Sequence, residues 1–264
     1  MFLAVELAAW AADLQPTEAD LELAERSLVD TVAVAIAARD EPVLARVAAR
    51  LAAAGATADI TALDAWFELL GGDPSAVAGR GSPAVPGGLA IKIFPCCYAL
   101  QRPISALAEL AGRERLDPAA VDRIVVRTPK GTVAPLIHHC PETGLQGKFS
   151  LEYAVAAALL DDHQGFTTFT DAAVRRPAAQ RLIRRVEVQL TDGGNGLLAG
   201  EFEVDIHLGN RMLHARQQFP PGSPQRPPSQ EELMRKVADC LTGTTVSPEA
   251  INWSNAPAIL RTHI

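Results

Sequence analysis

Apolar side chains recur every three or four residues through the first quarter of the chain, which is the spacing of one face of a helix. Residues 3–10 carry a first stripe of this kind and residues 17–36 carry a second, which Thr17 is placed to cap. Two further helices are expected at residues 42–51 and 61–70. The sequence therefore predicts a helical region over residues 1–72.

The rest of the chain mixes helical spacing with strict alternation of apolar and polar residues. Helices are expected at residues 103–112, 149–160, 171–185 and 229–240. Pro177 interrupts the third of them, and Ser229 begins the last with a capping box that ends at Glu232. Alternation predicts strands at residues 122–127 and 186–190 and a hairpin over residues 202–219. Gly209 and Asn210 supply the turn of that hairpin, and the whole pattern is typical of an α+β fold.

Changes in composition along the chain predict where its parts begin and end. Residues 73–88 are rich in Gly, Pro, Ser and Ala, which is typical of a linker. We therefore expect an N-terminal helical region at 1–72, a linker at 73–88 and a mixed α+β domain at 89–243. Residues 244–264 show no clear periodicity and are expected to form a tail.

Overall composition narrows the class of protein. The chain has 264 residues, 48% of them hydrophobic and 21% charged, which is ordinary for a globular protein. Its net charge of −7 argues against a nucleic-acid surface, since no basic stripe is available for phosphates. The apolar start contains Glu6 and no basic segment, and the Ala-rich stretches are too short to span a bilayer. We expect a cytoplasmic protein that binds neither nucleic acid nor membrane.

The four cysteines give no sign of a disulfide framework or a metal site. Two of them are adjacent and none forms a C-x-x-C pair, so reduced thiols are expected. No metal and no cofactor is predicted.

Lys92 is the most informative single position. It is one of only four lysines, and it stands between Ile91 and Ile93 just before an aromatic-proline step and a Cys-Cys pair. In an apolar cleft its ammonium group would bind a substrate carboxylate, and loss of water would lower its pKa. The alternative is a surface lysine whose stem lies over apolar neighbours.

Two segments carry a resemblance to a known family. Residues 89–97 read LAIKIFPCC and residues 148–161 read KFSLEYAVAAALLD. They resemble the LAIKPYPCC and KFSLPYAVAAALLDG segments of the 2-methylcitrate dehydratase family (MmgE/PrpD), which also includes cis-aconitate decarboxylases. Residues 169–177 and 30–35 are similar to further segments of that family, in the same order along the chain.

The resemblance implies an α+β domain like the C-terminal domain of this family, preceded by a shortened helical part. Most of the family's helical domain is missing, including its Asp- and His-rich active-site segment. The resemblance places Lys92 and Tyr153 at active-site positions, and it puts Gln101 or Arg102 where the family often has a histidine. Arginine can clamp a carboxylate but cannot act as a base near neutral pH. Gln101, Arg102 and Lys148 are therefore candidates for substrate binding.

Other residues offer proton-transfer chemistry. His138 and His139 lie in the loop before Lys148, and either could carry a proton near neutral pH. The alternative for both is a solvated loop. Tyr153 also has an alternative role, as a core residue whose hydroxyl group is satisfied internally.

Two functions remain open from the sequence. The first is a cofactor-independent acid-base enzyme of the lyase or isomerase type, catalysing dehydration, elimination or cyclisation in a biosynthetic pathway. Lys92 would stabilise an enolate of a small carboxylate or carbonyl substrate, and Tyr153, His138 or His139 would move the proton. The second is a catalytically degenerate paralogue that binds a full-length relative. A homodimer would also cover the surface left by the missing domain.

One structural feature separates these two functions. The enzyme is favoured if Lys92, Arg102 and Tyr153 converge on one enclosed pocket. The binding partner is favoured if Lys92 points into solvent.

Overall fold

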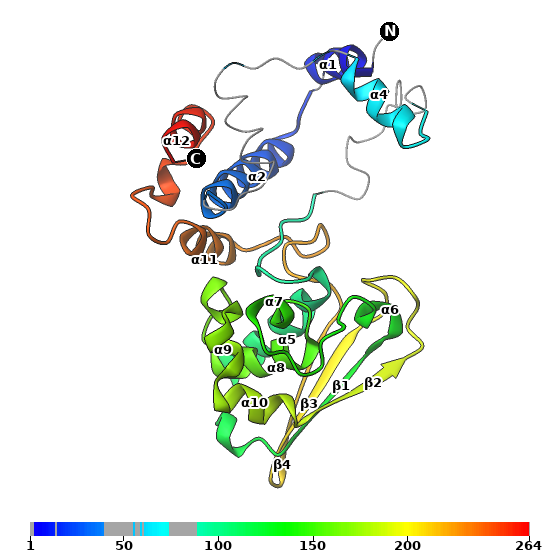
Figure 1. Cartoon of the computed structure of the whole chain (residues 1–264), viewed down its shortest axis with the longest axis vertical. Coiled ribbons are helices and arrows are strands. Elements are labelled where there is room, and N and C mark those ends of the chain that lie inside the picture. Colours follow the sequence, from blue (N-terminus) through cyan, green and yellow to red (C-terminus); the bar gives the residue numbers. More distant parts are fainter. Residues whose placement is uncertain are drawn as a thin grey trace. The chain divides into compact units, whose positions relative to one another are not determined.

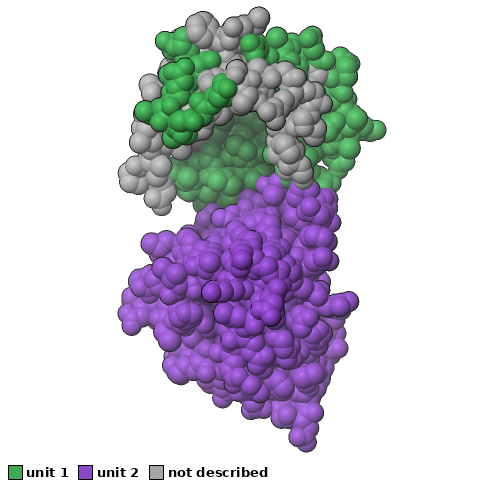
Figure 2. All heavy atoms as spheres, turned by 90° about the vertical axis from the view of Figure 1, so that its right-hand side faces the viewer, with its two compact units in different colours: residues 1–89, 240–264 green, residues 90–239 purple. Residues whose placement is uncertain are grey.

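The computed structural model describes residues 3–13, 15–39, 55, 59, 61–73 and 89–263. The chain divides into two compact units, residues 1–89 with 240–264 and residues 90–239, which are coloured separately in Figure 2. The helix expected at 42–51 lies outside the described residues, as does the expected linker apart from Asp73.

The first unit is helical. Its helices are α1 (Leu3–Asp13), α2 (Glu18–Ala37), α4 (Ala62–Leu69) and α12 (Ala256–His263), with a 3₁₀ turn η5 (Pro248–Ala250). Thr17 caps α2 reciprocally: its hydroxyl oxygen accepts from the Asp20 amide, and the Asp20 carboxylate accepts from the Thr17 amide. Helix α2 contacts α12. The sequence did not predict α12, because the segment that forms this helix lacks a clear apolar period.

The second unit contains a four-stranded mixed sheet. Its strands are β1 (Arg123–Pro129), β2 (Val186–Thr191), β3 (Phe202–Leu208) and β4 (Arg211–Gln217), in the order β2-β1-β3-β4. Strands β1 and β2 are parallel, whereas β3 pairs antiparallel with β1 and with β4. Gly209 turns the β3–β4 hairpin with a φ of 57°. These strands confirm the α+β prediction.

Helices cover one face of this sheet and make the core. Helix α5 (Gln101–Arg113) contacts β3, β4 and α8 (Leu151–Leu160), and α8 contacts α10 (Pro177–Ile183) (Figure 1). Val126, Val204 and Ala215 lie side by side in neighbouring strands and are all buried. Helix α8 is buried from Leu151 to Leu159, which explains why its sequence is apolar on every side.

Short elements complete the unit. They are η2 (Tyr98–Leu100), η3 (Pro118–Ala120), α6 (Lys130–Val133), α7 (Gly144–Gly147), η4 (Phe166–Phe169), α9 (Asp171–Arg175) and α11 (Gln230–Cys240). The predicted break near Pro177 separates α9 from α10, and the predicted capping box opens α11, where the Glu232 amide donates to the Ser229 hydroxyl.

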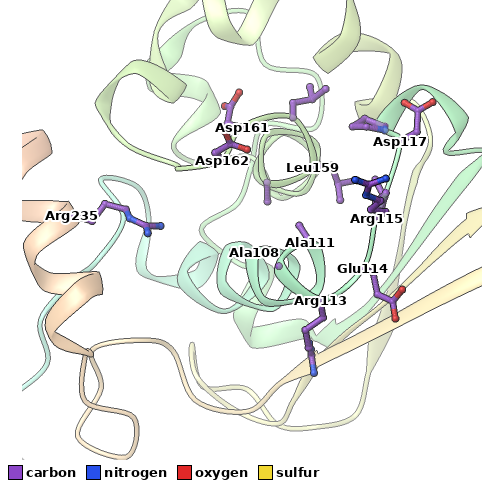
Figure 3. Close-up of a pocket in the computed structure, with 15 residues that line it drawn as sticks. Ala108, Ala111, Arg113, Glu114, Arg115, Asp117, Leu159, Asp161, Asp162 and Arg235 are labelled. Carbon is purple, nitrogen blue, oxygen red and sulfur yellow. The ribbon is translucent and has the colours of Figure 1, made fainter.

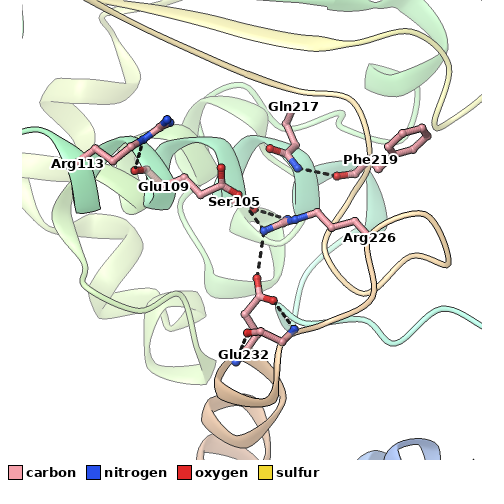
Figure 4. Close-up of polar contacts among 8 residues, drawn as sticks. Ser105, Glu109, Arg113, Gln217, Phe219, Arg226 and Glu232 are labelled. Carbon is pink, nitrogen blue, oxygen red and sulfur yellow. Dashed lines mark hydrogen bonds and ion pairs between the residues drawn. The ribbon is translucent and has the colours of Figure 1, made fainter. Parts of the chain in front are cut away.

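Hydrogen bonds and ion pairs of Arg226 hold the loop before α11 in place. The Arg226 guanidinium donates to the Ser105 hydroxyl at 2.6 Å and forms ion pairs with Glu109 and Glu232, as Figure 4 shows. This single side chain therefore links α5 to the first turn of α11. Among the described helices, none combines the length and the apolar character needed to cross a membrane.

Candidate active site

An extended segment presents Lys92 at the surface. Alternation buries Ile91 and Ile93 and leaves the lysine between them exposed. The Ile91 amide donates to the Gly222 carbonyl at 2.8 Å. Gly222 has a φ of 80°, and a Cβ atom there would lie 1.8 Å from the Ile91 carbonyl oxygen, so this contact requires glycine.

Gln101 holds the other end of the same segment. Its side-chain carbonyl accepts from the Phe94 amide at 2.9 Å, and its amide group donates to the Phe94 carbonyl at 2.9 Å. Because both ends of the Gln101 amide are engaged inside the protein, this residue fixes the backbone that carries Lys92.

The two motif segments meet at the adjacent cysteines. The Cys97 amide donates to the Lys148 carbonyl at 3.0 Å. Burial raises the pKa of the Cys96 thiol, while the positive charges of Lys92 and Lys148 both oppose that rise. Both ammonium groups therefore lie within electrostatic reach of one thiol, although 55 residues separate them in the chain.

The histidine loop lies along the same segment. The His138 amide donates to the Phe149 carbonyl at 3.3 Å, directly after Lys148. His139 then reaches the first turn of α8, where its Nδ1 atom lies 2.8 Å from Oε1 of Glu152. The Glu152 side chain is 10% exposed, whereas the His139 side chain is 76% exposed.

Glu152 is a residue that the sequence reasoning missed. The only signal was its position in the second motif segment, where the family segment has a proline. Its contact with His139 spans 13 residues and depends on the path of the intervening loop, so no local pattern reveals it.

Arg102 is fully buried, and its two terminal nitrogens donate mainly to backbone carbonyls, whereas its Nε atom has no hydrogen-bond partner among the described residues. Its guanidinium donates to the Gly200 carbonyl at 2.8 Å and to the Thr132 hydroxyl at 2.9 Å. Longer hydrogen bonds reach the carbonyls of Leu198, Ala199 and Gln218. Burial lowers the pKa of Arg102, yet an arginine stays charged, and here that charge holds the loop before β3.

Tyr153 also occupies a core position. It is fully buried, and its hydroxyl group donates to the Thr168 carbonyl. Burial raises its pKa to about 12, with the charge of Arg176 opposing the rise, so the phenol stays protonated near neutral pH. Its ring meets Phe169 edge to face, with centroids 6.0 Å apart.

The structure thus brings together part of the predicted site. Lys92, Lys148 and the His138–His139 loop lie around the meeting point of the two motif segments. In the part of the chain that the structure describes, Lys92 is exposed, so it does not converge with Arg102 and Tyr153 on one enclosed pocket.

A separate cavity of about 1020 Å³ opens at the other end of the helices (Figure 3). It is lined by the C-terminal ends of α5 and α8, by residues 114–118 and by Arg235. Four acidic residues line it against three arginines, and the two helix C-termini add partial negative charge, so the balance disfavours a carboxylate. The ten residues of α8 span about 15 Å, so this cavity is distinct from the lysines beside the start of that helix.

Comparison with known proteins identifies the class of protein to which this site belongs. The sequence model of the MmgE/PrpD C-terminal domain matches residues 94–254, which is more than half of the chain. The chain belongs to the MmgE/PrpD family. A cis-aconitate decarboxylase from Aspergillus terreus is 26% identical over 176 residues, which make up 61% of this chain and 35% of that protein. The match therefore spans about a third of that relative, which is an enzyme of the lyase type.

Proposed function

We propose that this chain is a lyase- or isomerase-type acid-base enzyme that binds a small carboxylate through Lys92 and Lys148. The observation that carries this proposal is the contact between the two motif segments, in which the amide of Cys97, five residues after Lys92, donates to the Lys148 carbonyl at 3.0 Å. Two lysines on these neighbouring segments outnumber the Glu152 carboxylate on the adjoining helix, and the resulting net positive charge suits a carboxylate ligand.

The proposed chemistry uses groups that remain accessible. The lysines hold the carboxylates and stabilise the enolate that forms when a proton leaves the carbon next to a carboxylate or carbonyl. His138, half-buried, and His139, exposed, are the groups placed to move that proton. No cofactor is needed for a reaction of this kind.

The relative gives the substrate class. The substrate in the name of that relative, cis-aconitate, is a tricarboxylate. We therefore propose a di- or tricarboxylate for this chain, or a larger molecule that carries such a group.

Arg102 and Tyr153 take a different role in this proposal. Their polar groups are bonded to backbone carbonyls, so we assign them to holding the fold around the site. Gln101 is likewise assigned to fixing the segment that carries Lys92.

A second candidate function rests on the openness of the same region, because an exposed Lys92 is the feature expected to favour a binding partner over an enzyme. Lys92 is exposed, and the neighbouring loop exposes Ile137, Leu145 and Phe149. Such a surface favours a chain that acts as a binding partner of a full-length relative, or that forms a homodimer.

Thermal unfolding with a panel of acids separates the two functions. At a concentration one hundred times Kd, a ligand stabilises by about 2.7 kcal/mol, which raises Tm by about 5 °C or more for a chain of this size. We expect such a shift with citrate or cis-aconitate, and we expect Lys92→Ala and Lys148→Ala to remove it. Lys130→Ala, at an exposed lysine in α6, is the matched control. If no acid shifts Tm, the carboxylate enzyme is wrong and the binding partner is favoured.

A further inference from the structure

The contact between His139 and Glu152 has the geometry of a proton-transfer pair. Glu152 lies in the first turn of α8 with its side chain 10% exposed, and its Oε1 atom is 2.8 Å from Nδ1 of His139. The histidine ring is largely exposed on the side away from this contact. One partner is therefore fixed in the protein interior while the other faces solvent.

The second oxygen of Glu152 strengthens this interpretation. Its Oε2 atom is buried and has no hydrogen-bond partner among the described residues. A buried carboxylate needs compensation for the water it has lost, and the hydrogen bond from His139 is the contact that supplies it. Glu152 therefore holds the imidazole firmly.

The chemistry of a carboxylate fixes the state of the ring. An ionised carboxylate only accepts hydrogen bonds, so Nδ1 of His139 must carry a proton. In the neutral imidazole the other nitrogen, Nε2, then has a free lone pair.

We propose that Glu152 is a positioning residue that fixes His139 in the Nδ1–H form and leaves Nε2 as the proton acceptor at the lysine site. Its use in catalysis rests on the proposed function, whereas the state of the ring does not. The contact with Glu152 also distinguishes the two histidines, because the His139 side chain has a carboxylate partner, whereas His138 is held through its backbone amide.

Another histidine in the chain provides an internal comparison. Nδ1 of His214 lies 2.7 Å from Asp205, so it is expected in the same Nδ1–H form. Asp205 is also paired with Arg127 at 2.7 Å, which already neutralises its charge. The Glu152 carboxylate has no such second cation among its described contacts, so more of its charge acts on His139.

Nitrogen-15 NMR of the imidazole rings tests the proposal directly. In the full chain at a pH where the rings are neutral, the His139 signals, identified by their loss in His139→Gln, should show a protonated Nδ1 and an unprotonated Nε2. In Glu152→Ala the ring loses its fixed partner, and the Nδ1–H form should fall from nearly complete to the minor form, because a free neutral ring favours Nε2–H. The His214 signals should stay unchanged in that variant, which shows that the fold is intact.

Two NMR results would overturn the assignment of His139 to the Nδ1–H form. A wild-type His139 ring that already averages between its two forms, or that carries its proton on Nε2, overturns the proposal without any variant. An unchanged His139 spectrum in Glu152→Ala with intact His214 signals overturns it as well. Because no substrate is present, failure of carboxylate binding leaves this result untouched, and failure of this result leaves carboxylate binding untouched.

Discussion

At the scale of single residues, buried charge and buried hydroxyl groups explain most of the polar interior around the site. Arg102 is a cation that forms no ion pair with a carboxylate of the described residues, and backbone carbonyls stabilise its charge. Such a residue cannot be removed without leaving those carbonyls unpaired inside the protein.

Replacing Arg102 with alanine should therefore destabilise the fold. Loss of hydrogen bonds to a charged group, each worth about 1.5–3 kcal/mol, predicts a total cost of at least about 3 kcal/mol in the free energy of unfolding. Urea denaturation measures this cost. Arg113→Ala on the same helix, where the arginine is exposed, should change stability by less than about 0.5 kcal/mol. Equal effects of the two substitutions would contradict a structural role for Arg102.

Tyr153 gives a second prediction at this scale. Tyr153→Phe keeps the ring packed against Phe169 but leaves the Thr168 carbonyl without its donor. We expect a loss of about 1–2 kcal/mol in stability and little change in carboxylate affinity. A large loss of affinity at unchanged stability would instead place the hydroxyl group at the binding site.

Some residue roles could be predicted from sequence and others could not. Lys92 was recognised as unusual from its apolar neighbours, but its exposure depends on the alternation that points Ile91 and Ile93 inward. The buried position of Arg102 depends on a loop almost one hundred residues further along the chain. Long-range contacts of this kind leave no local trace in the sequence.

At the scale of elements, the alternation of apolar and polar residues was enough to predict the strands. β1, β3 and β4 each have one face in the core and one more polar face, and the predicted hairpin turn at Gly209 is confirmed. Helix α12 was missed because its eight-residue segment is too short to show a clear apolar period, and its contact with α2 is not encoded locally.

The polar face of the sheet gives a pH prediction. Burial alone would raise the pKa of Asp205, but hydrogen bonds from His214 and Arg127 outweigh it and hold that pKa below its ordinary value. A carboxyl group with a lowered pKa contributes stability at pH values above its unfolded pKa, near 3.9, and loses that contribution as pH falls through the folded value.

Asp205→Asn should therefore cost about 1–2 kcal/mol at pH 5, from the lost charged hydrogen bonds, and much less at pH 2. Urea denaturation of both proteins at the two pH values measures the difference. Asp162→Asn, at an exposed carboxylate after α8, is the control and should show little change with pH. A cost for Asp205→Asn that does not shrink in acid would contradict the assignment.

At the scale of the whole molecule, the resemblance predicted the MmgE/PrpD family and the α+β fold class correctly. It could not predict how complete the site is, because an active site depends on which elements cover it. In the described part of the chain Lys92 is exposed and Lys148 is half-buried, and the large cavity lies at the other end of α8.

Calorimetric titration with citrate and cis-aconitate tests whether Lys92 and Lys148 form one carboxylate site. We expect saturable binding at one site per chain, about tenfold weaker in Lys92→Ala and in Lys148→Ala, which corresponds to about 1.4 kcal/mol each. The double variant should bind more weakly than either single variant, and Lys130→Ala should bind like the wild type. Absence of saturable binding, or equal weakening by Lys130→Ala, would contradict the account.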